Sequence, residues 1–192
     1  AWDLDNDGSF DDATGALINH SFDDNGTYTV KLQVTDDLGA TNDVTVLVTV
    51  DNVAPVIDSI SIPGTGSEGS AVNLTASASD VAGSNDTLTY TWTVSSINLV
   101  SDLILTGSTA SFTPGDNGTY SVDLSVTDED GGSVSSSSDV LVDNVAAAAN
   151  DDNNPSGSII EDDLSNNSVT VNVLSNDVDV AADIAKFTAT LT

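Results

Sequence analysis

The fold class of this chain is decided by one stretch, GTYTVKLQVTD at residues 26–36. Its apolar residues fall at every second position, which is the period of a β-strand with one buried face. The turn sequence DDLG follows at residues 36–39, and the valines of residues 44–50 alternate in the same way. This pattern predicts a β-hairpin.

The same stretch returns as GTYSVDLSVTD at residues 118–128, 92 positions further along the chain. The spacing holds through DNVA at residues 51–54, which matches DNVA at residues 143–146. Upstream, Trp2 and Trp92 also correspond. Residues about ninety apart therefore belong to two copies of one structural unit.

The second copy contains the complete strand pattern. Five apolar runs precede its hairpin, which runs from residue 120 to residue 142, and they lie at residues 56–62, 71–78, 88–94, 99–105 (the weakest) and 109–112. Seven short strands in about ninety residues are typical of an immunoglobulin-like sandwich. We therefore predict an all-β fold of tandem immunoglobulin-like β-sandwiches, strung like beads, whose first and last units are incomplete.

Three segments follow from this pattern. Residues 1–54 align with the later part of the repeat, so we expect them to form the C-terminal part of a sandwich. Residues 55–145 form a complete one. An abrupt small and polar linker, AAAANDDNNP, begins at residue 146. Residues 146–192 are thus predicted to be this linker and the N-terminal part of a third sandwich.

The composition excludes several classes of function. The chain has 31 Asp and Glu against 2 Lys and Arg, a formal net charge of −29. Nucleic acid is excluded as a partner because phosphate binding needs clustered basic residues. The absence of cysteine excludes thiolate zinc sites and thiol catalysis, and one histidine without arginine is a poor basis for a nucleophilic triad. No apolar run approaches membrane-spanning length, so we expect no membrane insertion.

The carboxylates still need solvent, salt or bound cations to compensate them. A high-salt habitat is one explanation, and bound Ca²⁺ is another that is compatible with the first. The strongest metal motif is the loop DLDNDGSFDD at residues 3–12, where Gly8 permits a tight reversal. The predicted ligands are side chains of Asp3, Asp5 and Asp7, a backbone carbonyl near Ser9, and a carboxylate of Asp11 or Asp12. The alternative is a solvated acidic loop.

Particular motifs in both copies resemble a known family. The sequences WDL at residues 2–4, HSF at residues 20–22 and the stretch at residues 26–36 with Gly39 are similar to the second half of a PKD (polycystic kidney disease) domain. The resemblance covers residues 1–54 as a partial domain and 55–145 as a complete one. The second copy has WTV at residues 92–94 and lacks the Asp-rich loop.

Residues 150–179 resemble the cadherin-like or VCBS-type repeats of large bacterial surface proteins. The two resemblances imply a secreted or cell-surface protein without catalytic activity, whose modules space or present other domains. Cadherin-like modules hold Ca²⁺ between domains, which implies a second, interdomain site. Its candidate ligands are Asp51, Asn52, Glu68, Asp80 and Asp86. The alternative is that these acids cap turns, as we expect of Asp36, Asp37, Asp128 and Asp130.

These observations favour a Ca²⁺-stabilised, non-catalytic spacer in a long secreted or cell-surface repeat protein, an adhesin shaft or a filament. The expected partners are neighbouring repeats of the same chain, other copies in a filament or surface layer, and a cell-surface glycan or protein. The alternative function is a carbohydrate- or protein-binding accessory module. We expect His20 to be structural beside Phe22, and the repeated Trp and Tyr residues to be core.

Overall fold

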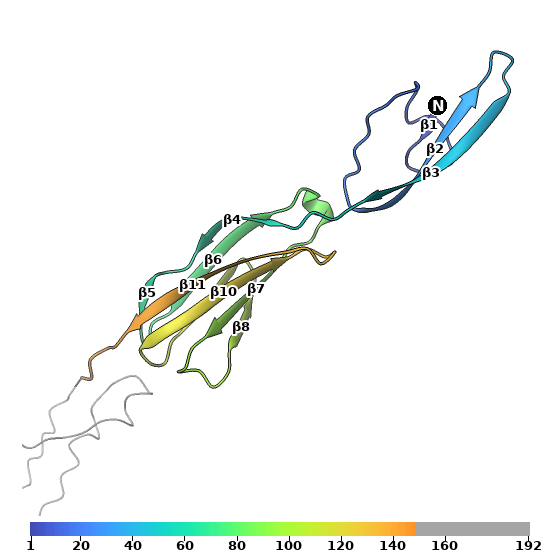
Figure 1. Cartoon of the computed structure of the whole chain (residues 1–192). Helices are drawn as coiled ribbons and strands as arrows, with labels where there is room; N and C mark the ends of the chain where they lie inside the picture. Colours follow the sequence, from blue (N-terminus) through green and yellow to red (C-terminus); the bar gives the residue numbers. More distant parts are fainter. Residues whose placement is uncertain (149–192) are drawn as a thin grey trace, which may run out of the picture. The chain divides into compact units, whose positions relative to one another are not determined.

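The computed structural model describes residues 1–148 and shows an all-β protein, as the sequence predicts (Figure 1). Its regular elements are eleven strands and one short 3₁₀ helix, η1 (Gly83–Asn85). The chain divides into two compact units. Among the described residues, the first contains residues 1–60, 76–91 and 124–136, and the second contains residues 61–75, 92–123 and 137–148.

The first repeat forms one three-stranded sheet in the order β1 (Trp2–Asp3), β2 (Gly26–Thr35), β3 (Thr41–Val50). Strands β2 and β3 pair antiparallel over their full length, from Gly26↔Val50 to Thr35↔Thr41, which confirms the predicted hairpin. Gly39 in the turn has φ +85°, a conformation that L side chains rarely adopt.

The second repeat has eight strands: β4 (Val56–Ser61), β5 (Thr65–Ser67), β6 (Val72–Ser79), β7 (Thr89–Ser95), β8 (Leu103–Thr106), β9 (Thr109–Phe112), β10 (Gly118–Thr127) and β11 (Ser133–Asp143). They form a five-stranded sheet in the order β5-β11-β10-β7-β8 and a three-stranded sheet in the order β4-β6-β9. Each expected segment contains a strand. Strand β5 was not expected, because its three residues have no alternation; it forms by parallel pairing of Thr65–Ser67 with Leu141–Asp143.

Alternation along β10 builds the core of this sandwich. Tyr120, Val122, Leu124 and Val126 have no exposed surface, and Trp92 of β7 is equally buried. The polar atoms of the two aromatic residues are satisfied locally. Trp92 Nε1 donates to Gly107 O at 2.9 Å, and Tyr120 Oη donates to Asp116 O at 2.9 Å. The predicted core role of Trp92 and Tyr120 is confirmed.

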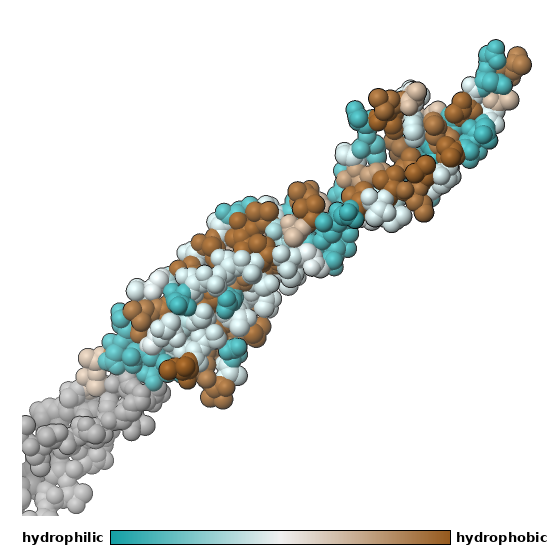
Figure 2. All heavy atoms as spheres, in the orientation of Figure 1, coloured by the Kyte–Doolittle hydropathy of each residue, from teal (hydrophilic) through white to brown (hydrophobic). Residues whose placement is uncertain are grey.

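The described part of the first repeat covers the matching face of its sheet only in part, at Val30, which is 8% exposed. Val34, Val44 and Val46 are 62%, 53% and 54% exposed, whereas Val126, which corresponds to Val34, is fully buried. Figure 2 shows hydrophobic residues on the surface of this repeat. Trp2 and Tyr28 are only half-buried. They nevertheless make the hydrogen bonds of their counterparts, from Trp2 Nε1 to Gly15 O and from Tyr28 Oη to Asp24 O.

Candidate metal sites

The first candidate site begins at Asp3, the last residue of β1, which has no exposed surface. Its Oδ2 accepts hydrogen bonds from Lys31 Nζ at 3.1 Å and from Gly8 N at 3.2 Å. Its Oδ1 is buried and has no hydrogen-bond partner among the described residues. A buried carboxylate oxygen without a partner lowers the stability of the fold. A further ligand on Asp3 Oδ1 would remove this cost.

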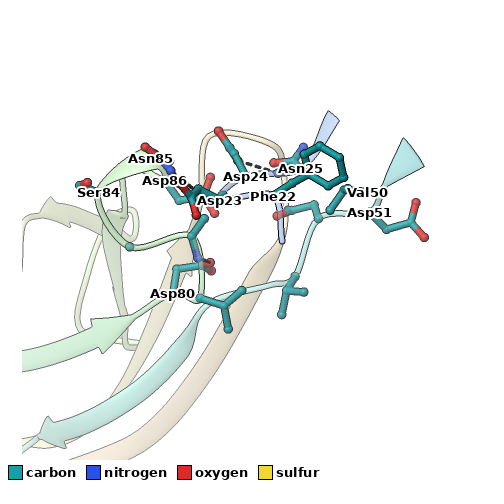
Figure 3. Close-up of a pocket in the computed structure, with 15 residues that line it drawn as sticks. Phe22, Asp23, Asp24, Asn25, Val50, Asp51, Asp80, Ser84, Asn85 and Asp86 are labelled. Carbon is teal, nitrogen blue, oxygen red and sulfur yellow. Dashed lines mark hydrogen bonds between the residues drawn. The ribbon is translucent and has the colours of Figure 1, made fainter. Parts of the chain in front are cut away.

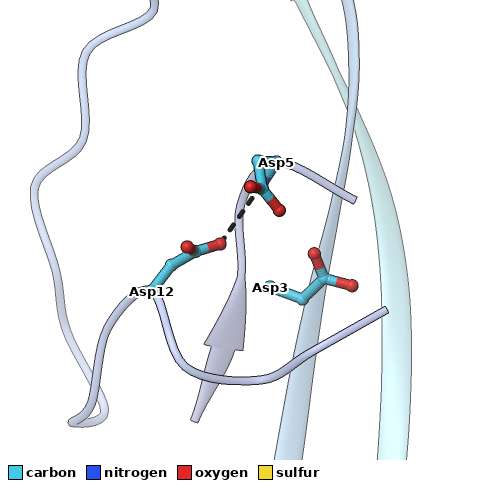
Figure 4. A group of neighbouring side chains, drawn as sticks. All are labelled: Asp3, Asp5 and Asp12. Carbon is cyan, nitrogen blue, oxygen red and sulfur yellow. Dashed lines mark hydrogen bonds between the residues drawn. The ribbon is translucent and has the colours of Figure 1, made fainter. Parts of the chain in front are cut away.

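Asp5 and Asp12 bring carboxylates to the same place (Figure 4). One oxygen from each of Asp3, Asp5 and Asp12 lies within 4.8 Å of the other two. Asp12 Oδ2 also accepts from Leu4 N at 2.6 Å and from Asp5 N at 3.3 Å, which closes the loop on itself. Oxygens that ligate one Ca²⁺ at about 2.4 Å lie at most about 4.8 Å apart, so this spacing suits that ion.

The other predicted loop ligands lie outside this group of three. Asp7 N donates to Asp5 Oδ1 at 3.0 Å, and Ser9 N donates to Asp7 Oδ1 at 2.6 Å. Asp7, Ser9 and Asp11 are exposed. Their part in metal binding stays a prediction, whereas Asp3, Asp5 and Asp12 are brought together.

Sequence reasoning missed the role of Lys31. Strand pairing places it directly opposite Asp3, so both side chains lie on the same face. Burial by itself raises the pKa of Asp3, but the hydrogen bond and charge of Lys31, with backbone donors at Gly8 and Asn6, lower that pKa below its usual value. Asp3 is therefore ionised at neutral pH. The second repeat has Thr93 and Asp123 at these positions and cannot form the pair.

The second candidate site combines three aspartates that each follow a structural element. Asp80 follows β6, Asp86 follows η1 and Asp128 follows β10. One oxygen from each lies within 4.8 Å of the other two. Asp86 is 4% exposed and Asp128 is 6% exposed. Residues 51–55 link β3 of the first repeat to β4 of the second, and Asn52 of this linker bonds to Asp128. We therefore call the three aspartates the linker-end site.

The hydrogen bonds at the linker-end site use only some of its oxygens. Asp80 Oδ1 accepts from Ala82 N at 3.0 Å. Asp128 Oδ1 accepts from the N–H groups of Asp130 and Gly132, and its Oδ2 accepts from Asn52 Nδ2 at 2.9 Å. In the part of the chain that the structure describes, Asp80 Oδ2 and both oxygens of Asp86 are buried without a hydrogen-bond partner.

The predicted role in a hairpin turn is confirmed for Asp128 and Asp36. Asp128 Oδ1 binds the turn between β10 and β11. In the first repeat, Asp36 Oδ1 accepts from Leu38 N and Ala40 N in the same way. The difference between the repeats is that Asp128 also receives the linker amide of Asn52.

At the linker-end site, the pKa values of Asp86 and Asp128 are shifted in opposite directions. Burial, then the neighbouring side chain of Asp80, then the charges of Asp24 and Asp128, raise the pKa of Asp86 to about 6. The Asn52 hydrogen bond, against the opposing effect of burial and with help from backbone N–H groups, lowers the pKa of Asp128 below its usual value. A divalent cation would remove the repulsion that Asp86 experiences.

Further acids surround Asp86 inside the first compact unit. Oxygens of Asp24, Asp86 and Asp130 also lie within 4.8 Å of one another. An open pocket at this place is lined by residues 22–25, 50–53 and 80–86 (Figure 3). Asn85 Nδ2 donates to Asp23 O across it at 3.1 Å. The pocket therefore has many oxygen ligands and few donors.

The predicted interdomain ligands divide into two sets. Asn52, Asp80 and Asp86 meet at the linker-end site, and exposed Asp51 lines the pocket without joining the group. Glu68 was predicted with them, but the structure places it elsewhere. The pairing of β5 with β11 brings it beside the end of β11, where its Oε1 accepts from Val145 N at 2.6 Å.

Sequence reasoning missed Asp24 and Asp130 as members of these groups and assigned Asp128 only to its turn. Asp24 is the first residue of the DNG sequence that leads into β2, and Asp128 ends the Thr-Asp sequence at the end of β10. An aspartate occupies each of these two positions in both copies of the repeat. This recurrence was the sequence signal that could have pointed to them as site residues. The pairing of His20 with Phe22 is confirmed, since their ring centroids lie 4.7 Å apart.

The family profile of the PKD domain matches residues 1–50 and 52–142, so the chain belongs to the PKD domain family. PKD domains are typically non-catalytic modules of secreted or surface proteins. The predicted cadherin-like or VCBS-type segment lies outside the described residues. Among residues 1–148, no helix reaches the length and apolarity needed to cross a membrane.

Two solved structures are similar to this chain. The PKD1 domain of Vibrio anguillarum Epp is 22% identical, with a TM-score of 0.36, over 48% of this chain and 98% of that one. The three N-terminal domains of the bacteriophage RB49 highly immunogenic outer capsid protein are 21% identical, with a TM-score of 0.37. That match covers 78% of this chain and 48% of the phage chain. No curated protein matches the chain.

Proposed function

We propose that this chain is a non-catalytic spacer segment of a secreted or cell-surface protein, and that Ca²⁺ bound in the loop of residues 3–12 stabilises its first repeat. Membership of the PKD family supports the extracellular spacer role. The observation that carries the calcium assignment is the buried, unpartnered Oδ1 of Asp3, together with the nearby carboxylates of Asp5 and Asp12.

The mechanism is electrostatic and mechanical. The excess of acids in a chain of net charge −29 repels itself, and a bound divalent ion converts one repulsive cluster into a crosslink between loop positions. The crosslink joins the end of β1 to Asp12, so it holds the loop against the sheet. Neighbouring repeats of the same chain are the proposed partners, and other copies or a surface ligand are further ones.

A carbohydrate-binding module is the less favoured function. Phe22 and Tyr28 stack with centroids 4.0 Å apart beside His20 and are partly exposed. Their counterparts Phe112 and Tyr120 are core residues of the second repeat. The aromatic group is therefore better explained as core than as a sugar platform.

The test is thermal unfolding of the full chain in Ca²⁺ and in chelator, followed by tryptophan fluorescence. We expect a dissociation constant on the order of 10⁻⁴ to 10⁻³ M, as for other extracellular modules. At a free Ca²⁺ concentration one hundred times that constant, the first repeat should gain about 2.7 kcal/mol. The double variant Asp5→Asn/Asp12→Asn should lose most of this gain.

The control is Asp37→Asn/Asp43→Asn, which removes two exposed charges from the same repeat but leaves the loop intact. It should keep the gain from Ca²⁺. Equal responses of the two double variants would contradict a specific loop site and would indicate general charge screening. Mg²⁺ at the same concentration separates screening from a Ca²⁺ preference.

A further inference from the structure

We propose that the linker-end site, Asp80, Asp86 and Asp128, is a second Ca²⁺ site, and that its occupation holds the linker residue Asn52 in place. This inference rests on the proposed function in that both require Ca²⁺ binding. It uses other residues, none of which belongs to the loop of residues 3–12.

The fold leaves three buried oxygens of the linker-end site without a hydrogen-bond partner among residues 1–148. Asp86 is almost fully buried, yet neither of its oxygens has a hydrogen-bond partner among residues 1–148. Asp80 Oδ2 is buried and unpartnered beside it. Buried polar groups are nearly always satisfied, so three such oxygens within one cluster are suited to bind a cation.

The carboxylates around these oxygens are spaced as the ligands of one Ca²⁺ ion would be. The three carboxylates converge to within the span of one Ca²⁺ coordination sphere, and Asp24 and Asp130 supply further oxygens next to Asp86. Ca²⁺ takes about six to eight oxygen ligands in flexible arrangements, which suits ligands from separate loops. Lys31, the lysine among residues 1–148, is paired with Asp3 instead of with these acids. The raised pKa of Asp86 has the direction expected for an uncompensated cluster.

The linker is attached to the same site through Asn52. Asn52 Nδ2 donates to Asp128 Oδ2, while Asp128 Oδ1 holds the β10–β11 turn. A Cβ on Gly132 would lie only 2.9 Å from Ala54 Cα, so the linker backbone passes close to that turn. A cation on Asp80, Asp86 and Asp128 would fix the carboxylate that Asn52 binds, and it would thereby order the linker.

The experiment is a Ca²⁺ titration of the full chain followed residue by residue in ¹H–¹⁵N NMR spectra. The variants are Asp86→Asn for the linker-end site and Asp5→Asn/Asp12→Asn for the loop. Asp123→Asn is the control, since it removes one exposed charge from β10 of the same repeat. Asp86→Asn relieves repulsion, so it should fold, and its spectrum in chelator checks this.

In the wild-type chain and in Asp123→Asn, we expect saturable shifts at the amides of residues 3–12 and, separately, of residues 80–86, 128–132 and 52–54. Asp86→Asn should weaken Ca²⁺ binding at the second set by at least about tenfold, a loss of about 1.4 kcal/mol in binding free energy. The first set should be unaffected. The loop variant should show the reverse.

The outcomes separate the two proposals. Saturable shifts in residues 3–12 alone, equal in wild type and Asp86→Asn, would overturn the linker-end site and leave the proposed function standing. Saturable shifts that are lost only in Asp86→Asn would support the linker-end site and overturn the loop site. Weak, unsaturable shifts everywhere, including near Asp123, would overturn both.

Discussion

At the scale of single residues, the features that matter are buried carboxylates with unequal surroundings. Asp3 is paired with Lys31 and has a lowered pKa, whereas the charges that act on Asp86 come from other acids and its pKa is raised. Burial by itself raises the pKa of both residues. The difference arises from the neighbour that strand pairing or turn geometry supplies.

Gly132 provides a residue-scale prediction. Its backbone conformation is accessible to alanine, but a Cβ there would meet Asp128 Oδ2, Asn52 Nδ2 and, at 2.9 Å, Ala54 Cα. Gly132→Ala should therefore displace the linker and lower the free energy of unfolding by about 1–3 kcal/mol, measured by urea denaturation.

The control for this substitution is Gly115→Ala, since a Cβ at Gly115 has nothing within 4 Å. It should be neutral or stabilise the chain by up to about 1 kcal/mol through the unfolded state. Equal effects of the two substitutions would show that the linker does not pack against the β10–β11 turn.

At the scale of elements, the same hairpin occurs in two environments. Strands β2 and β10 share their alternation, their turn aspartate and their tyrosine hydrogen bond. Only β10 has its apolar residues fully buried. The hairpin pattern therefore specifies the local structure, and the burial depends on which other strands lie against it.

The pair Val126 and Val34 tests this dependence. Val126→Ala removes a fully buried side chain and should cost about 1.5–3 kcal/mol of unfolding free energy. Val34→Ala, at the corresponding position of β2, should change stability by less than about 0.5 kcal/mol, because Val34 is 62% exposed.

Chemical denaturation of the two variants, compared with the wild-type chain, measures both effects. A large loss for Val34→Ala would contradict the exposure of this face and would indicate that something covers it in solution.

At the scale of the whole molecule, the dominant property is charge. The chain has 31 acidic residues and only two lysines to offset their repulsion. The one lysine in the described residues forms its ion pair with Asp3. Stability must therefore respond to the ionic environment as well as to packing.

The corresponding prediction concerns salt in the absence of divalent ions. Raising NaCl from about 10 mM to about 150 mM shortens the Debye length from about 30 Å to about 8 Å. The melting temperature of the metal-free chain should rise over this range, as measured by circular dichroism. An unchanged or falling melting temperature would show that self-repulsion is not a significant destabilising term.

The sequence by itself determined the all-β class, the two repeats and their hairpins, because alternation and turn residues act over a few neighbouring positions. It also placed Asp3, Asp5 and Asp12 in one loop, since they are close along the chain. Strand β5 was not predictable in this way, because its three residues are ordered only by β11.

Only the tertiary structure decided which distant acids meet. Asp80, Asp86 and Asp128 follow three different elements, and the Lys31–Asp3 pair and the place of Glu68 depend on strand register. Burial, which leaves some oxygens unpartnered and shifts their pKa values, is a property of the assembled sheets and turns. Local pattern contains no information about it, because the groups that exclude water from a carboxylate come from remote parts of the chain.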